Sequence, residues 1–329
     1  MESVWRHLSS EQVYRTEMGV ISRRALKWMS ALFLGRAPRR APISLLDNSP
    51  LRALIERTIH FRRIQAAVDA GDLHALSITA SGYTTGESVS FYQGHGDIRP
   101  WRRSRRLGVP ALLAPEHLLA SAAIPAVFPA VRLGDQYFGD GSVRQLAPLS
   151  PALHLGADRI LVIGVSANAE IMQAPVDNTD PGYPSVAHIL GHVLNSAFVD
   201  SLEGDVERLE RINRTLEQMP AGQVFDGADR LRKIDVLKIY PSQPLDVIAA
   251  EHAEDLPRTL RMFLRGSGAT SGQGSTLMSY LLFEPGFCHE LIKLGYHDAM
   301  RLERPIMRFL GHDPLAVHGK AGLPASDTC

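Results

Sequence analysis

One acidic side chain in this sequence stands where a carboxylate could do chemistry. Asp140 lies between Gly139 and Gly141 and directly follows Gln136 to Phe138, a short run that predicts a β-strand. A carboxylate fixed at a strand end can act as a general base, and flanking glycines let the backbone turn sharply and approach another loop closely. Taken alone, such a tripeptide is more often a plain turn. Its surroundings must therefore decide between the two interpretations.

A serine that this base could activate is harder to find. The elbow motif G-x-S-x-G, which exposes a serine between a strand and a helix, does not occur in the 329 residues. The nearest match, Gly164 to Asn168, lacks the closing glycine, and we interpret its Ser166 as a polar residue at a strand end. Residues 266–275 are predicted to form a mobile loop whose serines have the wrong spacing: Ser267, Ser271 and Ser275.

Histidines and cysteines give weaker signals. His188 and His192 stand four residues apart, which places two imidazole rings on one face of a helix. Ile189 follows His188 where an HExxH metal site needs glutamate. Cys288 and His289 are adjacent, so they face different ways on a helix and do not predict a dyad. The sequence therefore indicates neither a metal site nor a cofactor.

Two further groups raise the question of a phosphate or lipid surface. A basic run follows Trp101 and could bind nucleic acid or anionic lipid, although a solvated loop is the commoner cause; its members are Arg102, Arg103, Arg105 and Arg106. The second group is apolar and is predicted to pack into the core rather than to meet a membrane; it comprises Trp28, Met29, Leu32 and Phe33.

The composition narrows the class of protein. Lys plus Arg and Asp plus Glu both number 35, so the formal net charge is zero and no chain-wide field favours nucleic acid. Cys288 and Cys329 are the only cysteines, too few for a disulfide framework. The sequence has no signal-peptide pattern and no apolar run of about 20 residues. These features favour a cytoplasmic globular protein, with peripheral membrane contact left open.

The elements around Asp140 predict an α/β arrangement. Residues 75–80 and 89–92 alternate apolar and polar side chains on either side of Thr84 to Gly86, which is typical of a β-hairpin. The apolar run Arg159 to Val165 is typical of a strand buried on both faces. Helices are predicted at 25–34, 50–60, 61–70, 115–123 and 148–155. Helices alternating with a buried strand favour a sheet flanked by helices.

The second half of the chain is predicted to be mainly helical. A long helix from Ser185 to about Gln218 precedes a strand at Val236 to Tyr240, and later helices are expected at 256–264, 276–283 and 287–309. We therefore divide the chain into a core over 1–170, a mainly helical extension over 171–313 with a strand near 236–240, and a loose tail over 314–329.

The stretch from Ala120 to Ser166 resembles the block around the catalytic aspartate of patatin-like phospholipases. It reads ASAAIPAVFPAVRLGDQYFGDGSVRQLAPLSPALHLGADRILVIGVS. In that family a short helix and an IPxxFP turn lead to Asp-Gly-Gly or Asp-Gly-Ala, and a helix with PL…A…LGA and a buried strand follow. Other segments are similar to the family as well: LLDNSPLRALI, LSITASGYTTGESVSFYQG and LIKLGYHDAM. The resemblance covers most of Met1 to Val165.

This resemblance implies a serine-type lipid acyl hydrolase, a phospholipase or esterase of lipid degradation, that uses a Ser-Asp dyad with Asp140 as its aspartate. Ser142 stands where the family usually has glycine or alanine. The family's serine elbow and oxyanion loop lie upstream of the segment that VWRHLSSEQVY resembles. We therefore expect an N-terminally truncated patatin-like sheet, without its nucleophile and first strands, that is inactive by itself toward a lipid or ester substrate. The alternative is a catalytically dead scaffold or lipid-binding paralogue.

Overall fold

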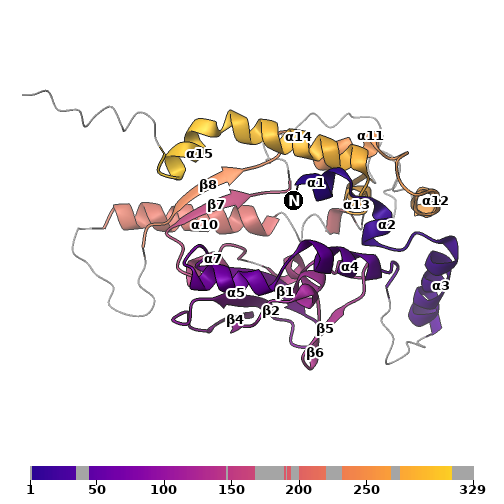
Figure 1. The fold of residues 1–329 in the computed structure, drawn as a ribbon, viewed down its shortest axis with the longest axis horizontal. Helices are drawn as coiled ribbons and strands as arrows, with labels where there is room; N and C mark the ends of the chain where they lie inside the picture. Colours follow the sequence, from indigo (N-terminus) through magenta and orange to yellow (C-terminus); the bar gives the residue numbers. More distant parts are fainter. Residues whose placement is uncertain are drawn as a thin grey trace, which may run out of the picture.

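The computed structural model describes residues 2–34, 44–145, 147–166, 189, 191–193, 200–219, 232–267 and 275–312. In these ranges the protein has a six-stranded mixed sheet, a two-stranded parallel sheet and helices around both (Figure 1). The predicted α/β class is thus confirmed. No helix in these ranges is long and apolar enough to cross a lipid bilayer.

The six-stranded sheet carries Asp140. Its strands are β1 (Ala75–Gly82), β2 (Ser88–Gly94), β3 (Trp101–Arg103), β4 (Arg106–Pro110), β5 (Val131–Leu133) and β6 (Gln136–Asp140), in the order β3-β4-β2-β1-β6-β5. Only the pair β2 and β4 is parallel within this sheet. The predicted hairpin is confirmed, because β1 and β2 are antiparallel with Ala80 opposite Val89. The predicted strand before Asp140 is also confirmed.

Helices cover one side of this sheet. They are α4 (Ser49–Thr58), α5 (Arg62–Asp69) and α6 (Pro115–Ser121), and Figure 1 shows α4 and α5 between the six-stranded sheet and the rest of the molecule. Pro50 and Pro115 each stand in the first turn of their helix, where a missing N–H costs nothing. The core beneath α6 includes Ile78, Phe91, Ala120 and Phe138.

The two-stranded sheet corrects one prediction. β7 (Arg159–Ile163) pairs in parallel with β8 (Asp235–Ile239). The expectation that this strand is buried on both faces is wrong, because its side chains alternate. Val162 faces a cluster shared with α10 (Asp200–Glu217), whereas Ile163 is 72% exposed. One face of β7 is therefore open in the part of the chain that the structure describes.

The N-terminal and C-terminal helices share one core. They are α1 (Glu2–Arg6), α2 (Ser10–Val13), α3 (Met18–Leu34), α11 (Leu245–Glu251), α12 (Arg258–Ser267), α13 (Ser275–Ser279), α14 (Pro285–Arg301) and α15 (Glu303–Phe309). Except for α1 and α15, which have no buried residues, these helices contribute to a single apolar cluster that includes Leu260 and Phe287 and also takes in Leu8 and Phe128. Tyr14 ties the two ends together, since its hydroxyl donates a hydrogen bond to the Leu281 carbonyl at 2.5 Å.

Several boundaries differ from the sequence-based expectation. The predicted helix over 287–309 is two helices, α14 and α15, and the helix over 148–155 is the shorter α7 (Ser150–His154). The predicted mobile loop over 266–275 is wrong at both ends, because Ser267 ends α12 and Ser275 begins α13. Ser185, His188, Ser271 and the tail over 314–329 lie outside the described residues.

Candidate active site

Asp140 is held at the end of β6 by its own backbone. Its N–H donates a hydrogen bond to the Ala123 carbonyl at 2.9 Å, in the turn that follows α6. Across the sheet it lies opposite Ala80 of β1. The residue is 8% exposed. A carboxylate that is both buried and fixed from two sides has little freedom to move away from a reacting group.

Both glycines beside Asp140 are closely packed. A side-chain carbon at Gly141 would overlap the carbonyl oxygen of Thr79, and one at Gly139 would overlap the ring of Tyr83. The contact at Gly141 cannot be relieved cheaply, because the Thr79 atom is backbone, whereas the contact at Gly139 is with the end of a side chain that can move. Glycine is therefore the residue that lets β6 end so close to β1.

Ser142 makes the two oxygens of Asp140 unequal. Its N–H and its hydroxyl both donate to Oδ1, at 2.9 and 2.6 Å. Asp140 thereby caps the short 3₁₀ turn Gly141–Arg144. The other oxygen, Oδ2, accepts no hydrogen bond from the described residues. It remains the oxygen that could accept a proton from a reacting group.

The surroundings shift the proton affinity of Asp140 and of two tyrosines. Burial raises the pKa of Asp140, and the hydrogen bonds from Ser142 oppose that rise. Tyr280 has its pKa raised to about 12, mainly by burial and further by the negative charges of Asp140 and Asp246. Burial and Asp140 also raise the pKa of Tyr83. The carboxylate thus lies beside phenols that stay protonated near neutral pH.

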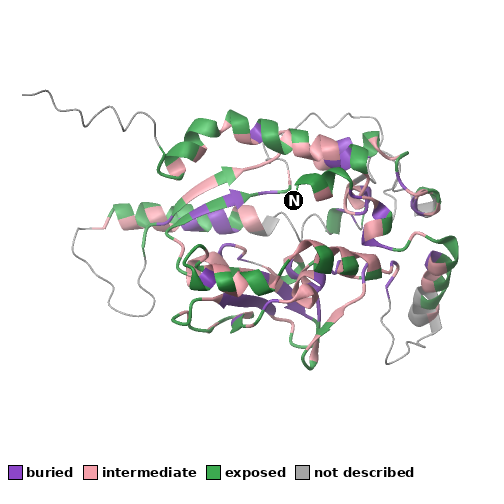
Figure 2. Ribbon diagram, in the orientation of Figure 1, coloured by how far each residue is buried: buried purple, intermediate pink, exposed green. Residues whose placement is uncertain are grey.

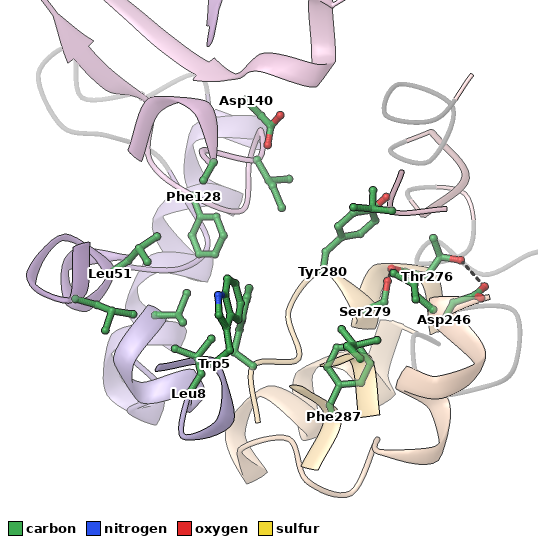
Figure 3. A pocket seen from close by; sticks show the side chains of 18 of the residues that line it. Trp5, Leu8, Leu51, Phe128, Asp140, Asp246, Thr276, Ser279, Tyr280 and Phe287 are labelled. Carbon is green, nitrogen blue, oxygen red and sulfur yellow. Dashed lines mark hydrogen bonds between the residues drawn. The ribbon is translucent and has the colours of Figure 1, made fainter. Parts of the chain in front are cut away.

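Asp140 opens onto a large apolar cavity of about 670 Å³. Figure 3 shows Asp140 at one end of it, and most lining side chains are apolar. Those labelled on one wall are Trp5, Leu8, Leu51 and Phe128, and Phe287 lies across from them. Cavities of about 300–1,000 Å³ with few polar groups are typical of small-molecule sites. The size and lining suit a long hydrocarbon group.

Four polar side chains of the cavity lie together on the wall formed by α11, α13 and the residue after α13. Asp246, Thr276, Ser279 and Tyr280 lie there, and the Thr276 hydroxyl donates to Asp246 Oδ2 at 3.3 Å (Figure 3). A ligand in this cavity would therefore meet hydrocarbon along most of its length and polar groups near Asp140 and Tyr280.

The structure places some of the other candidate residues in the cavity and others outside it. Ser166 and His192 line the same cavity as Asp140. Cys288 is buried, which raises the pKa of its thiol, whereas the neighbouring His289 lies 3.3 Å from the Arg6 guanidinium. The adjacent residues therefore face different surroundings, as their helical spacing predicts. No group of three or more metal-ligating side chains is found among the described residues.

The basic run is a hairpin rather than a loop. β3 and β4 are antiparallel, with Arg103 opposite Arg106, and Arg105 has a positive φ of 57° at the turn between them. Trp101 stacks on Tyr92, with ring centroids 5.1 Å apart. Arg102 pairs with Glu87 at 3.3 Å. The hairpin lies at an edge of the sheet, and none of its residues lines the cavity.

The cavity itself was not predicted. Trp5 of α1, Leu51 of α4 and Tyr280 after α13 meet in it although they are far apart in the sequence. Each stands in a short apolar stretch that is equally typical of a core. The only local signal was the resemblance that the sequence analysis gave for VWRHLSSEQVY and LLDNSPLRALI, and a sequence resemblance does not give the contacts.

Comparisons with known proteins do not identify a family for this chain. A scan of the chain against protein-family models gives no match, and a search of curated proteins gives none either. The functional argument therefore depends on the site and on the sequence resemblance.

Proposed function

We propose that this chain is the aspartate-bearing part of a patatin-like lipid acyl hydrolase. In this proposal Asp140 accepts the proton of a serine hydroxyl, and that serine belongs to a segment outside the present sequence. The observation that carries the proposal is a buried carboxylate, fixed by β6 and Ser142, at the end of an apolar cavity of about 670 Å³. The sequence block around Asp140 adds the family resemblance.

The proposed chemistry follows from the properties of serine. A serine hydroxyl is a weak nucleophile until a base within hydrogen-bond reach takes its proton. Asp140 Oδ2 would take that proton while the serine oxygen attacks the acyl carbonyl. The released alcohol would carry the proton away, leaving an acyl-serine ester that water then hydrolyses. The cavity would hold the acyl chain during both steps.

Ser166 is an alternative nucleophile. Among the described residues that line the cavity, it is the only serine close to the end of a strand. It directly follows the β7 region, but its sequence lacks the second glycine of the elbow motif. In the elbow motif, the tight turn between strand and helix exposes the serine hydroxyl. Because Ser166 lacks the glycine that this turn requires, we assign it no catalytic role. It therefore supplies a useful control.

The first experiment reads the coding DNA in frame upstream of Met1 and expresses the extended protein. We expect a G-x-S-x-G motif preceded by a glycine-rich loop, and hydrolysis of p-nitrophenyl esters. Asp140→Asn should lower kcat/KM by about 10²–10⁴-fold, the usual contribution of a general base. Asp246→Asn removes the same charge from the same cavity and should lower kcat/KM by less than about tenfold.

Two results would overturn this proposal. Full hydrolysis by the Asp140→Asn protein, with circular dichroism showing an intact fold, would remove Asp140 from the mechanism. Hydrolysis by the present chain that disappears with Ser166→Ala would show that the nucleophile lies within this sequence.

A second candidate function is lipid binding without catalysis. One observation favours it: the cavity is assembled from this chain alone, whereas the elbow motif is not in the sequence. The chain should then bind palmitate in isothermal titration calorimetry. Ala122 lines the cavity, so Ala122→Trp should weaken palmitate binding. Leu112 is exposed and does not line the cavity, so Leu112→Trp should leave the binding unchanged. Palmitate binding with no hydrolysis by the extended protein would favour this candidate over the enzyme.

A further inference from the structure

Helix α12 has an outward face that combines positive charge with an apolar side chain. Arg258, Met262 and Arg265 stand at i, i+4 and i+7, so they lie on one side of the helix. All three are exposed, and Met262 is 60% exposed. On the other side, Leu260 and Leu264 are buried in the core shared by the two ends of the chain. The helix is thus anchored by one face and free on the other.

Helix α3 repeats this arrangement. Arg23, Leu26 and Lys27 stand at i, i+3 and i+4 and are all exposed, Leu26 by 64%. Ile21, on another side of the helix, is buried in the same core as Leu260 of α12. Here too an anchored helix turns basic and apolar side chains outward.

The two helices lie at the same end of the molecule. Figure 1 shows α3 and α12 together at the end remote from α10 and α15, and Figure 2 shows exposed residues on both. A hydrogen bond links their starts, since the Thr259 hydroxyl donates to the Thr16 carbonyl at 2.7 Å. We call the six exposed side chains the α3–α12 surface: Arg23, Leu26, Lys27, Arg258, Met262 and Arg265.

The charge of this surface is local and uncompensated. Neither helix contains an aspartate or glutamate, although the whole chain carries equal numbers of acidic and basic residues. Within the described ranges, no ion pair engages the four cations of the surface. By contrast, Arg24 on the inner side of α3 pairs with Asp47 at 3.0 Å. The outward cations are therefore available to an external anionic partner.

We propose that the α3–α12 surface docks the protein onto an anionic lipid bilayer. Amphipathic helices that present Lys and Arg beside exposed apolar side chains bind in the plane of a membrane interface, where the cations meet lipid headgroups and the apolar groups enter the acyl boundary. A nucleic acid would use the four cations but would leave Leu26 and Met262 exposed to water. The inference does not depend on hydrolase activity, because it is argued from the exposed side chains of α3 and α12 alone.

Vesicle flotation with the full chain tests the inference. Flotation is chosen because vesicle-bound protein rises in the gradient, whereas aggregated protein sinks. We expect binding to phosphatidylcholine vesicles that contain about 30% phosphatidylserine, weak binding to phosphatidylcholine alone, and a loss of binding as salt rises from about 0.1 M to about 0.5 M.

Charge variants locate the contact. Each basic residue near an anionic membrane is worth about fivefold in affinity. The double variants Arg23→Gln/Lys27→Gln and Arg258→Gln/Arg265→Gln should therefore each weaken vesicle binding by roughly 25-fold. Arg102→Gln/Arg105→Gln removes the same charge from the β3–β4 hairpin and should change binding by less than about twofold. Leu26→Ser/Met262→Ser keeps every charge and should also weaken binding.

Three outcomes would overturn the inference. The first is no preference for anionic vesicles. The second is loss of binding in the hairpin control with full binding in both helix variants. The third is tight binding of a DNA oligonucleotide that Leu26→Ser/Met262→Ser leaves unchanged, with no vesicle binding. Equal melting temperatures of all variants exclude unfolding as the cause of a loss.

Discussion

At the scale of the residue, two opposing influences set the pKa of Asp140. Burial raises its pKa, while both hydrogen bonds from Ser142 favour the ionised form. Because burial dominates, the pKa in the folded protein lies above the ordinary value of 3.8. The folded protein therefore binds this proton more tightly than the unfolded chain does, and ionisation of Asp140 at neutral pH costs stability.

A neutral substitution should recover that cost. Asp140→Asn keeps the shape of the side chain and can still accept hydrogen bonds from Ser142. The contribution of the native carboxyl to stability is complete below pH 3.8 and is lost as the pH rises through the folded pKa. We therefore expect a higher Tm than wild type near neutral pH and no gain below pH 3.8. Thermal unfolding at several pH values measures this, and a lower Tm at neutral pH would contradict it.

A substitution at Ser142 should change the pKa of the Asp140 carboxyl. Ser142→Ala removes the hydroxyl that donates at 2.6 Å and keeps the N–H bond, so the pKa of Asp140 should rise further. Ser142→Thr keeps a hydroxyl and should leave the pKa close to that of wild type. Carbon-13 NMR titration of the aspartate carboxyls reads this directly, and the acid limb of kcat/KM in the extended protein should move to higher pH. An unshifted titration in Ser142→Ala would show that the hydroxyl does not act on the carboxylate.

At the scale of the element, the approach of β6 to β1 should be intolerant of any side chain. Gly141→Ala would push a carbon into the Thr79 carbonyl and should destabilise the fold by about 1–3 kcal/mol. Gly204→Ala in α10 is the matched control, because nothing lies within 4 Å and the helix gains about 0.5–1 kcal/mol from the substitution. Urea unfolding of both variants measures the difference. Similar stability in both would show that the close approach does not exist.

Elements with a clear local pattern were predicted, and those set by distant contacts were not. β1, β2 and β6 follow from alternating side chains and from turns that contain glycine. The β3–β4 hairpin was missed because its turn uses Ser104 and Arg105, without the Asn-Gly or Asp-Gly pair that signals such a turn. The exposed face of β7 was missed because an apolar run does not tell how many of its faces are covered.

The same limit applies to the site. Asp140 and its glycines were predicted as a candidate site because they are contiguous and resemble a family motif. Tyr280 was not, because it and Asp140 come to the same cavity only through the fold, and no spacing in the sequence records that relation. Ser166 was correctly placed after a strand, yet its presence in the cavity depends on the same packing.

At the scale of the whole molecule, the contact between Tyr14 and Leu281 joins the two ends of the chain. Tyr14 is fully buried, so Tyr14→Phe leaves the Leu281 carbonyl without its partner and should cost about 1–3 kcal/mol. Tyr296→Phe is the control, since Tyr296 is 64% exposed and its loss should cost less than about 0.5 kcal/mol. Thermal denaturation of both variants measures the two effects. Equal, small losses would mean that the two ends are held by apolar packing alone.

The wide separation of the cavity residues also has a consequence for synthesis. The lining runs from Val4 to Leu291, so the cavity cannot close until nearly all of the described chain has left the ribosome. A nascent chain can form the β1–β2 hairpin and place Asp140 at the end of β6 well before that moment. The carboxylate is thus in place before α13 and α14, which supply the last part of the cavity lining, have been made. A ribosome stalled before α13 would display the acid without the part of the cavity wall that Tyr280 and Phe287 supply.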